Sequence, residues 1–183
     1  MKPYKPVRYP RPDRFLEVIY LNIYSEFANP NGFLKEKKMV NVHDVAKYFL
    51  LKGDDDEENG ICNLKLQKLL YYAQGFYLTL FEQPLFDSPI VAWRHGPVCP
   101  EVYHQYKNHG GNLISAPKNF EPTSLFSQKQ IAFLDEVYEV FGQFSAWKLR
   151  NMTHDEPPWA SNEINAGEIS VDEMANYFKT RIK

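Results

Sequence analysis

Pro89-Ile-Val-Ala-Trp93-Arg-His95-Gly-Pro-Val98-Cys-Pro100-Glu-Val-Tyr103 is the most informative segment of this 183-residue chain. Its first residues, Ile90 to Trp93, are short and β-branched enough to favour a small strand. The pair Gly96-Pro97 predicts a turn, and Pro100 suits the first turn of a helix that ends at Gly110-Gly111. Because the segment gathers His, Arg and Cys at one bend, it is also the first place to look for chemistry.

A long helix is predicted just before this segment, over about residues 64–82, with Asn63 as its cap. Its apolar residues recur at helical spacing, at Leu66, Leu69, Leu70, Ala73, Tyr77, Leu80 and Phe81. Lys65, Lys68 and Glu82 are expected to face away from this stripe. Tyr71, Tyr72 and Phe76 widen the apolar surface, so we expect this helix to be central.

Four further helices are expected from their capping residues. Asn41 precedes an apolar pattern that reaches Leu50, and Ser145 precedes one that reaches about Thr153. Capping-box spacing joins Ser127 to Gln130 and Ser170 to Glu173. Residues 112–126 are expected to form a loop. The predicted fold class is mainly α, a compact helical globule with a minor short β element, plus an N-terminal helical extension.

Residues 1–38 differ in character from the rest of the chain. They carry eight Lys/Arg and four Asp/Glu, a net of +4, whereas residues 39–183 carry thirteen and nineteen, a net of −6. Prolines make residues 1–12 extended, and a helix is predicted over residues 13–28. We expect residues 1–38 to be an accessory extension and residues 39–183 to be the main domain. The apolar positions of the extension's helix are Leu16, Ile19, Tyr20, Ile23, Tyr24 and Phe27.

Composition narrows the possible partners and the compartment. The net charge of −2 argues against nucleic acid as a partner. No apolar run approaches the roughly 20 residues that span a bilayer, and no secretory signal pattern is present, so no membrane partner is expected. Cys62 and Cys99 lack CxxC spacing and suit two reduced thiols, although a disulfide stays open. The expected location is the cytoplasm.

Histidines offer the only candidate chemistry, and each has a structural alternative. None of the five has zinc-site spacing, so neither a metal nor a cofactor is expected. His95 could act as a general base, with Cys99 as a nucleophile, but a ring that fixes the tight turn is the favoured interpretation, because no nucleophile motif accompanies it. His154 with Asp155 and Glu156 could form a second cluster. A helix end capped by a charged His154 is the favoured interpretation, because the helix dipole stabilises an imidazolium there.

Three segments together resemble the Panacea domain, the family of SocA-like or GepA-like proteins of bacteria and phages. They are Leu66–Phe76, the stretch from Pro84 through Tyr103, and Leu149–Trp159. The family's third segment usually reads Thr-His-x-Glu-x-Pro-Trp, and here it is Thr153-His-Asp-Glu-Pro-Pro-Trp159. The family often has Tyr at the position of His95. The signature residues, structural or interfacial, are Gln67, Tyr71, Tyr72, Trp93, His95, Gly96, Pro97, Val98, Tyr103, His154, Glu156, Pro157 and Trp159.

The resemblance implies an antitoxin without enzymatic activity that neutralises a cognate toxin, encoded nearby, by direct protein binding. One branch of the family implies an alternative, an adaptor that delivers the toxin to an ATP-dependent protease. Two alternatives come from the residues: an enzyme that uses His95 and His154 in one pocket, and a DNA-binding autoregulator that uses the basic arm. The six apolar positions listed for the extension are candidate toxin contacts, and packing of that helix on its own domain is equally expected.

Overall fold

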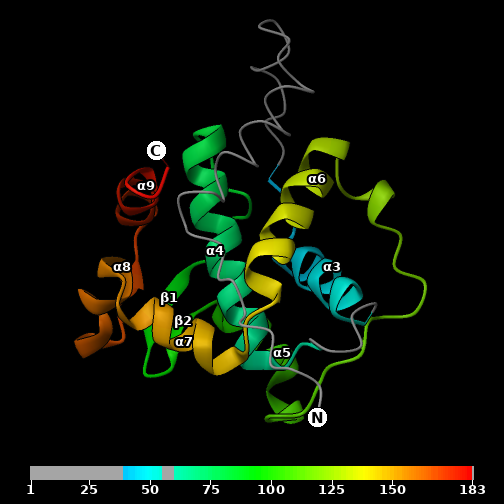
Figure 1. Cartoon of the computed structure of the whole chain (residues 1–183), viewed down its shortest axis with the longest axis horizontal. Helices are drawn as coiled ribbons and strands as arrows, with labels where there is room; N and C mark the ends of the chain where they lie inside the picture. Colours follow the sequence, from blue (N-terminus) through cyan, green and yellow to red (C-terminus); the bar gives the residue numbers. More distant parts are fainter. Residues whose placement is uncertain (1–38, 55–59, 183) are drawn as a thin grey trace, which may run out of the picture.

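In the computed structural model, which describes residues 39–54 and 60–182, helix α4 (Asn63–Phe81) stands in the middle of the molecule (Figure 1). Sixteen of its 19 residues are buried, so the helix is covered on all sides rather than along one stripe. The prediction of a central helix is confirmed. Its burial is explained by its composition, since aromatic and aliphatic side chains occupy almost every face.

Six other helices in the described part of the chain surround α4. Helix α9 (Val171–Lys179) lies on one side of α4 in Figure 1, and α6 (Gln128–Val137) and α3 (Val42–Asp54) lie on the other. Helix α7 (Ala146–His154) also packs on α4, and α5 (Pro100–Tyr106) and the short α8 (Pro157–Ala160) complete the set. The mainly helical prediction is confirmed. The helix expected over residues 13–28 lies outside the described residues.

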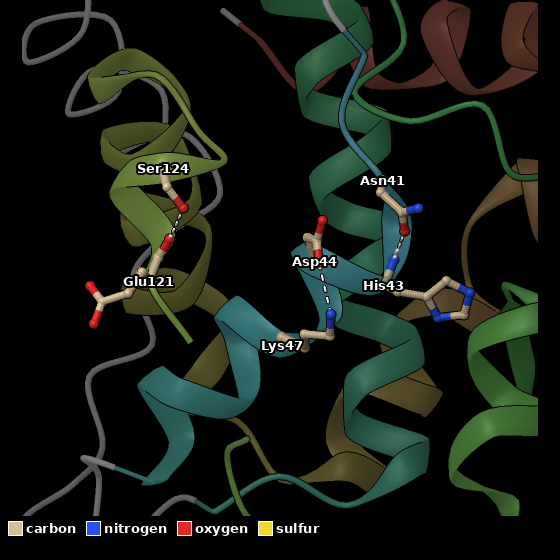
Figure 2. Close-up of polar contacts among 6 residues, drawn as sticks. All are labelled: Asn41, His43, Asp44, Lys47, Glu121 and Ser124. Atoms are coloured by element: carbon tan, nitrogen blue, oxygen red, sulfur yellow. Dashed lines mark hydrogen bonds and ion pairs between the residues drawn. The ribbon is translucent and has the colours of Figure 1, made fainter. Parts of the chain in front are cut away.

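Capping residues begin most of these helices as predicted. The Asn41 side-chain oxygen accepts a hydrogen bond from the His43 backbone N–H at 2.8 Å, and Lys47 pairs with Asp44 one turn on (Figure 2). Complete capping boxes begin α6 at Ser127 and α9 at Ser170, and the Ser145 hydroxyl accepts from the Lys148 N–H at 3.2 Å in α7. Local hydrogen bonds of this kind depend only on nearby residues, which is why the pattern was readable.

The cap predicted for α4 is wrong. Cys62 holds the N-cap position and makes no side-chain capping bond, and Asn63 is the first helical residue. The Asn63 amide instead donates to the Tyr103 carbonyl at 3.2 Å and accepts from Gln67 at 3.0 Å. The Asn63 amide thus bonds a carbonyl 40 residues further along the chain, which a local capping rule does not detect.

A three-stranded antiparallel sheet lies against the helices, in the order β2-β1-β3. Strand β1 (Ile90–Trp93) confirms the predicted strand, and it pairs with β2 (Gly96–Val98) and with β3 (Glu168–Ile169). The predicted Gly96-Pro97 turn is wrong, because Trp93 pairs with Gly96 and the turn falls at residues 94–95. Proline is compatible with β2 because this strand is at the edge of the sheet.

The remaining segments follow the predictions closely. Helix α5 continues as a 3-10 turn, Lys107–His109, and ends at Gly110 with a φ of 56°. Residues 112–126 form a loop that contains one 3-10 turn, Pro122–Ser124, where the Ser124 hydroxyl donates to the Glu121 carbonyl (Figure 2). Helix α6 passes into a π-helical turn, Tyr138–Gly142.

Within residues 39–54 and 60–182, no helix is both long and apolar enough to cross a bilayer.

Candidate functional site

Gln67 on α4 is the centre of a buried hydrogen-bond network. Its side-chain oxygen accepts from the Cys99 backbone N–H at 2.9 Å, and its amide nitrogen donates to Asn63 at 3.0 Å. Asn63 in turn donates to the Tyr103 carbonyl. These bonds satisfy the buried Cys99 backbone N–H at the N-cap of α5, and they tie this helix to α4.

Lys68, the next residue, holds the strand β2 against α4. Its side chain is fully buried, and its ammonium donates to the Pro97 carbonyl at 2.7 Å. Burial, aided by the positive charge of Arg150, lowers the pKa of Lys68 to about 7. The expectation that Lys68 faces away from the core is wrong. Its contact is with a strand about 30 residues further along the chain, so helical periodicity could not reveal it.

Gly96 lies at the closest approach between β2 and its two neighbouring helices. Its φ is 94°, and a Cβ at this position would lie 2.7 Å from the Thr153 Oγ1 and 2.8 Å from the Lys68 Nζ. Only glycine accepts this backbone conformation and this lack of space together. The hairpin is therefore pressed between α4 and α7.

The Trp159 side chain joins the third signature segment to the hairpin. Its indole N–H donates to the Trp93 carbonyl at 2.9 Å, and its ring stacks on His154 with centroids 3.5 Å apart. Burial, together with the nearby positive charges of Arg150, Lys68 and His95, lowers the pKa of His154 to about 4. The charged His154 predicted from the helix dipole is therefore wrong, because the imidazole is neutral at pH 7.

Glu156 is a buried carboxylate among tyrosines. The Tyr72 hydroxyl donates to its Oε1 at 2.9 Å, while Oε2 and the nearby Tyr71 hydroxyl have no hydrogen-bond partner among the described residues. Burial raises the pKa of Glu156 to about 7. Pro157 then begins α8 directly after it. The predicted signature residues Tyr71, Tyr72 and Glu156 thus meet in one place, although about 84 positions separate them.

An open groove lies beside Gln67 and the β1–β2 hairpin. Its volume is about 630 Å³, and Figure 1 shows the elements that form it, α4, the β1–β2 hairpin, α5 and the start of α7. The Trp93 and Tyr103 rings meet edge to face at 5.0 Å, and His95 approaches Trp147 at 6.1 Å. Five of the predicted signature residues line the groove, namely Gln67, Trp93, His95, Val98 and Tyr103.

The groove does not bring the proposed catalytic histidines together. His95 lines it, whereas His154 is absent from its wall and stacks on Trp159. Burial raises the pKa of Cys99 to about 11, so its thiol stays protonated and is a poor nucleophile at neutral pH. The His95 ring lies edge to face with the exposed Trp147 ring at the groove. Within the described residues, no group of three His, Cys, Asp or Glu is placed to hold a metal ion.

The bend that contains Arg94 was a candidate site in the sequence, but nothing there indicated that Arg94 lies near Lys107 and Trp147. Arg94, Lys107 and Trp147 line the groove together, but they come from the hairpin, the 3-10 turn after α5 and the start of α7. Trp147 follows a helix cap and reads as an ordinary core aromatic, yet it is 61% exposed. The candidate toxin contacts Leu16, Ile19, Tyr20, Ile23, Tyr24 and Phe27 lie outside the described residues.

These features define a mainly helical domain. In it, the three segments that carry the family resemblance are joined by buried polar contacts, and an open groove lies beside them. The family model described as "Antitoxin SocA-like, Panacea domain" matches residues 66–160, more than half of the chain. The chain therefore belongs to the SocA-like Panacea-domain family, and the resemblance seen in the three segments is confirmed.

A curated relative agrees with this family. The chain is 44% identical over 54 residues to the Antitoxin SocA of Caulobacter vibrioides (strain NA1000 / CB15N). The match covers 30% of this chain and 29% of the relative, so the chain spans less than a third of that protein's length. No solved structure matches.

Proposed function

We propose that this protein is an antitoxin of a toxin–antitoxin system and that it neutralises a cognate toxin, encoded nearby, by direct binding in the cytoplasm. The observation that carries the proposal is membership of the SocA-like antitoxin family over residues 66–160. The name of the Caulobacter relative, Antitoxin SocA, supports the same role. On this proposal the protein acts without catalysis.

The groove supports a role in binding. Protein interfaces are enriched in Trp, Tyr and Arg, and such residues carry much of the binding free energy. Trp93, Arg94, Tyr103 and Trp147 line one groove of the described structure. The hydrogen bonds of Gln67 and Lys68 hold the groove's walls in place before any partner arrives, which lowers the entropic cost of association.

Co-expression with the neighbouring reading frame tests the proposal. We expect the full chain to be harmless alone, to restore growth when the neighbouring product arrests it, and to co-purify with that product. An empty vector and the neighbouring product alone are the controls. Failure of both rescue and complex formation would contradict the proposal.

Titration and an immunoblot separate direct binding from the enzyme and the protease-adaptor alternatives. A binding antitoxin needs about one equivalent or more to silence its toxin, whereas an enzyme acts at a small fraction of an equivalent. A protease adaptor lowers the cellular amount of the toxin, so an immunoblot of the toxin distinguishes it. We expect stoichiometric neutralisation with an unchanged toxin level.

A further inference from the structure

The groove beside the hairpin has the size and the exposed aromatic surface of a docking site. Its volume of about 630 Å³ is enough to take up one or two large side chains, because ligand pockets measure about 300–1,000 Å³. Trp147 at its edge is 61% exposed. Protein interfaces are enriched in tryptophan and tyrosine, so an exposed tryptophan beside an aromatic groove is available to a partner.

Charge distinguishes this groove from the rest of the molecule. Among the described residues, its ionisable wall includes Arg94, Lys107 and His95 and no Asp or Glu, although the chain as a whole carries −2. Arg94 and Lys107 are exposed, and neither forms an ion pair with another described residue. A partner with carboxylates would therefore gain attraction without displacing an existing partner.

Further positive charge lies behind the groove. Arg150 and Lys68 come close enough to His154 to lower its pKa, and His95 adds to the same effect. The Arg150 Nε is buried and has no hydrogen-bond partner among the described residues. The Arg150 guanidinium strengthens the positive potential at the hairpin, since charges near a low-dielectric wall are poorly screened.

The chain's own N-terminal extension suits the groove poorly. Residues 1–38 carry a net of +4, so they share the sign of Arg94 and Lys107. Nucleic acid offers negative charge, but three basic side chains provide only weak and salt-sensitive contact with phosphates. A protein segment with carboxylates and an apolar side chain satisfies both the charge and the aromatic wall.

We infer that this groove binds a segment of the partner protein in which an aromatic or large aliphatic side chain is flanked by carboxylates. The apolar side chain lies against Trp93, Tyr103 and Trp147, and the carboxylates face Arg94 and Lys107. The inference rests on the proposed function, because the partner that presents the segment is the toxin. It assigns toxin contact to the main domain as well as to the extension.

Affinity measurements on full-length variants test the inference with the purified product of the neighbouring reading frame. We expect Trp147→Ala, and the double change Arg94→Glu with Lys107→Glu, each to weaken binding about tenfold or more. Ile164→Ala changes a 93% exposed apolar residue outside the groove, and Lys118→Glu with Lys179→Glu reverses two exposed charges elsewhere. These controls should bind like the original chain. If the groove variants also bind like the original chain, the inference is wrong and the proposed function stands.

Short capped peptides test the groove without the toxin. The probes are Asp-Glu-Phe-Leu-Asp-Glu, its basic counterpart Lys-Arg-Phe-Leu-Lys-Arg, the apolar-free Asp-Glu-Gly-Ser-Asp-Glu and a thymidine hexanucleotide, each at 150 mM salt. The readout is the NMR signal of the three tryptophan indole N–H groups, with Trp147 assigned by Trp147→Phe. Trp159 is an internal reference because its N–H bonds to the Trp93 carbonyl.

We expect the acidic aromatic peptide to shift the Trp147 signal at the lowest concentration of the four probes. An equal response to the basic peptide, a stronger response to the hexanucleotide, or no response to any probe would overturn the inference. The peptide experiment tests whether the groove binds an acidic aromatic segment even if the neighbouring product does not bind and the proposed function fails.

Discussion

Gly96 is the residue on which the site depends most sharply. It combines a φ of 94° with neighbours from two helices, Lys68 and Thr153, at less than 3 Å from a Cβ position. The strained conformation and the lack of space are separate costs for any other residue. Because β2 continues into the groove wall at Val98, a change at Gly96 affects both stability and the groove.

The change Gly96→Ala should lower the free energy of unfolding by about 2–4 kcal/mol, the sum of backbone strain and overpacking. Urea denaturation measures it. Gly110→Ala is the matched control, since Gly110 also has positive φ, 56°, but nothing lies within 4 Å of its Cβ position. We expect a smaller loss for that control, because only the cost of backbone strain remains. Equal losses would mean that packing around Gly96 contributes nothing.

Glu156 makes stability depend on pH in a defined direction. Its pKa is about 7 in the native state against 4.5 in the unfolded chain, so the native state holds the proton more tightly. Its contribution to stability is complete below pH 4.5 and is lost as the pH rises through about 7. Glu156→Gln cannot lose a proton, and its amide oxygen still accepts the hydrogen bond of Tyr72.

The stability of Glu156→Gln relative to the original chain should therefore rise by about 3 kcal/mol between pH 4.5 and pH 8, measured by urea denaturation at each pH. Subtracting the free energy of unfolding of the original chain from that of Glu156→Gln at each pH removes the pH dependence that Lys68 contributes to both. Glu173→Gln is the control, because hydrogen bonds from Ser170 lower the pKa of Glu173. The contribution of Glu173 to stability exists above pH 4.5 and is lost as the pH falls. The stability of Glu173→Gln relative to the original chain should therefore change in the opposite direction. A flat profile for Glu156→Gln would show that the carboxylate is solvated.

Among the elements, α9 illustrates how a local signal fixes a helix and how packing then places it. Its capping box joins Ser170 and Glu173, and the Met174 and Phe178 side chains of the same helix are buried. Phe178 lies against Gly75 of α4, where a Cβ would approach its ring to 2.1 Å. The small residue lets the two helices approach closely.

Removing the α9 cap should cost about 1 kcal/mol, because one N–H of the first turn loses its acceptor. The change is Ser170→Ala, and thermal or urea unfolding measures it. Ser115→Ala, at an exposed loop serine, should leave stability unchanged. If both variants were equally stable, the box would be dispensable in the folded chain.

At the scale of the whole molecule, the division between residues 1–38 and 39–183 remains a proposal. Among the described residues, the hydrophobic core cluster runs from Val42 to Phe178 and includes residues of all seven described α-helices. The extension's opposite net charge also suits a separate role. We propose that it supplies part of the toxin contact.

Deleting residues 1–38 should leave cooperative unfolding intact but weaken neutralisation of the neighbouring product. Circular dichroism follows folding, and growth rescue follows neutralisation, with the full chain as the reference. A deleted chain that folds and neutralises fully would show that toxin contact is confined to residues 39–183. Retained binding with reduced affinity would fit contact through both the extension and the groove.

The sequence alone determined six of the seven described helices, the caps of α3, α6, α7 and α9, the strand at Ile90–Trp93 and the family. These depend on short-range spacing, on capping bonds within three residues and on the order of the three segments that resemble the family. Asn63 and Lys68 were misjudged because their partners are the Tyr103 and Pro97 carbonyls, far along the chain. Only the tertiary structure decided that Lys68 is buried and that His154 is neutral. It also decided that Arg94, Lys107 and Trp147 share one groove, because proximity and desolvation arise when distant segments pack together.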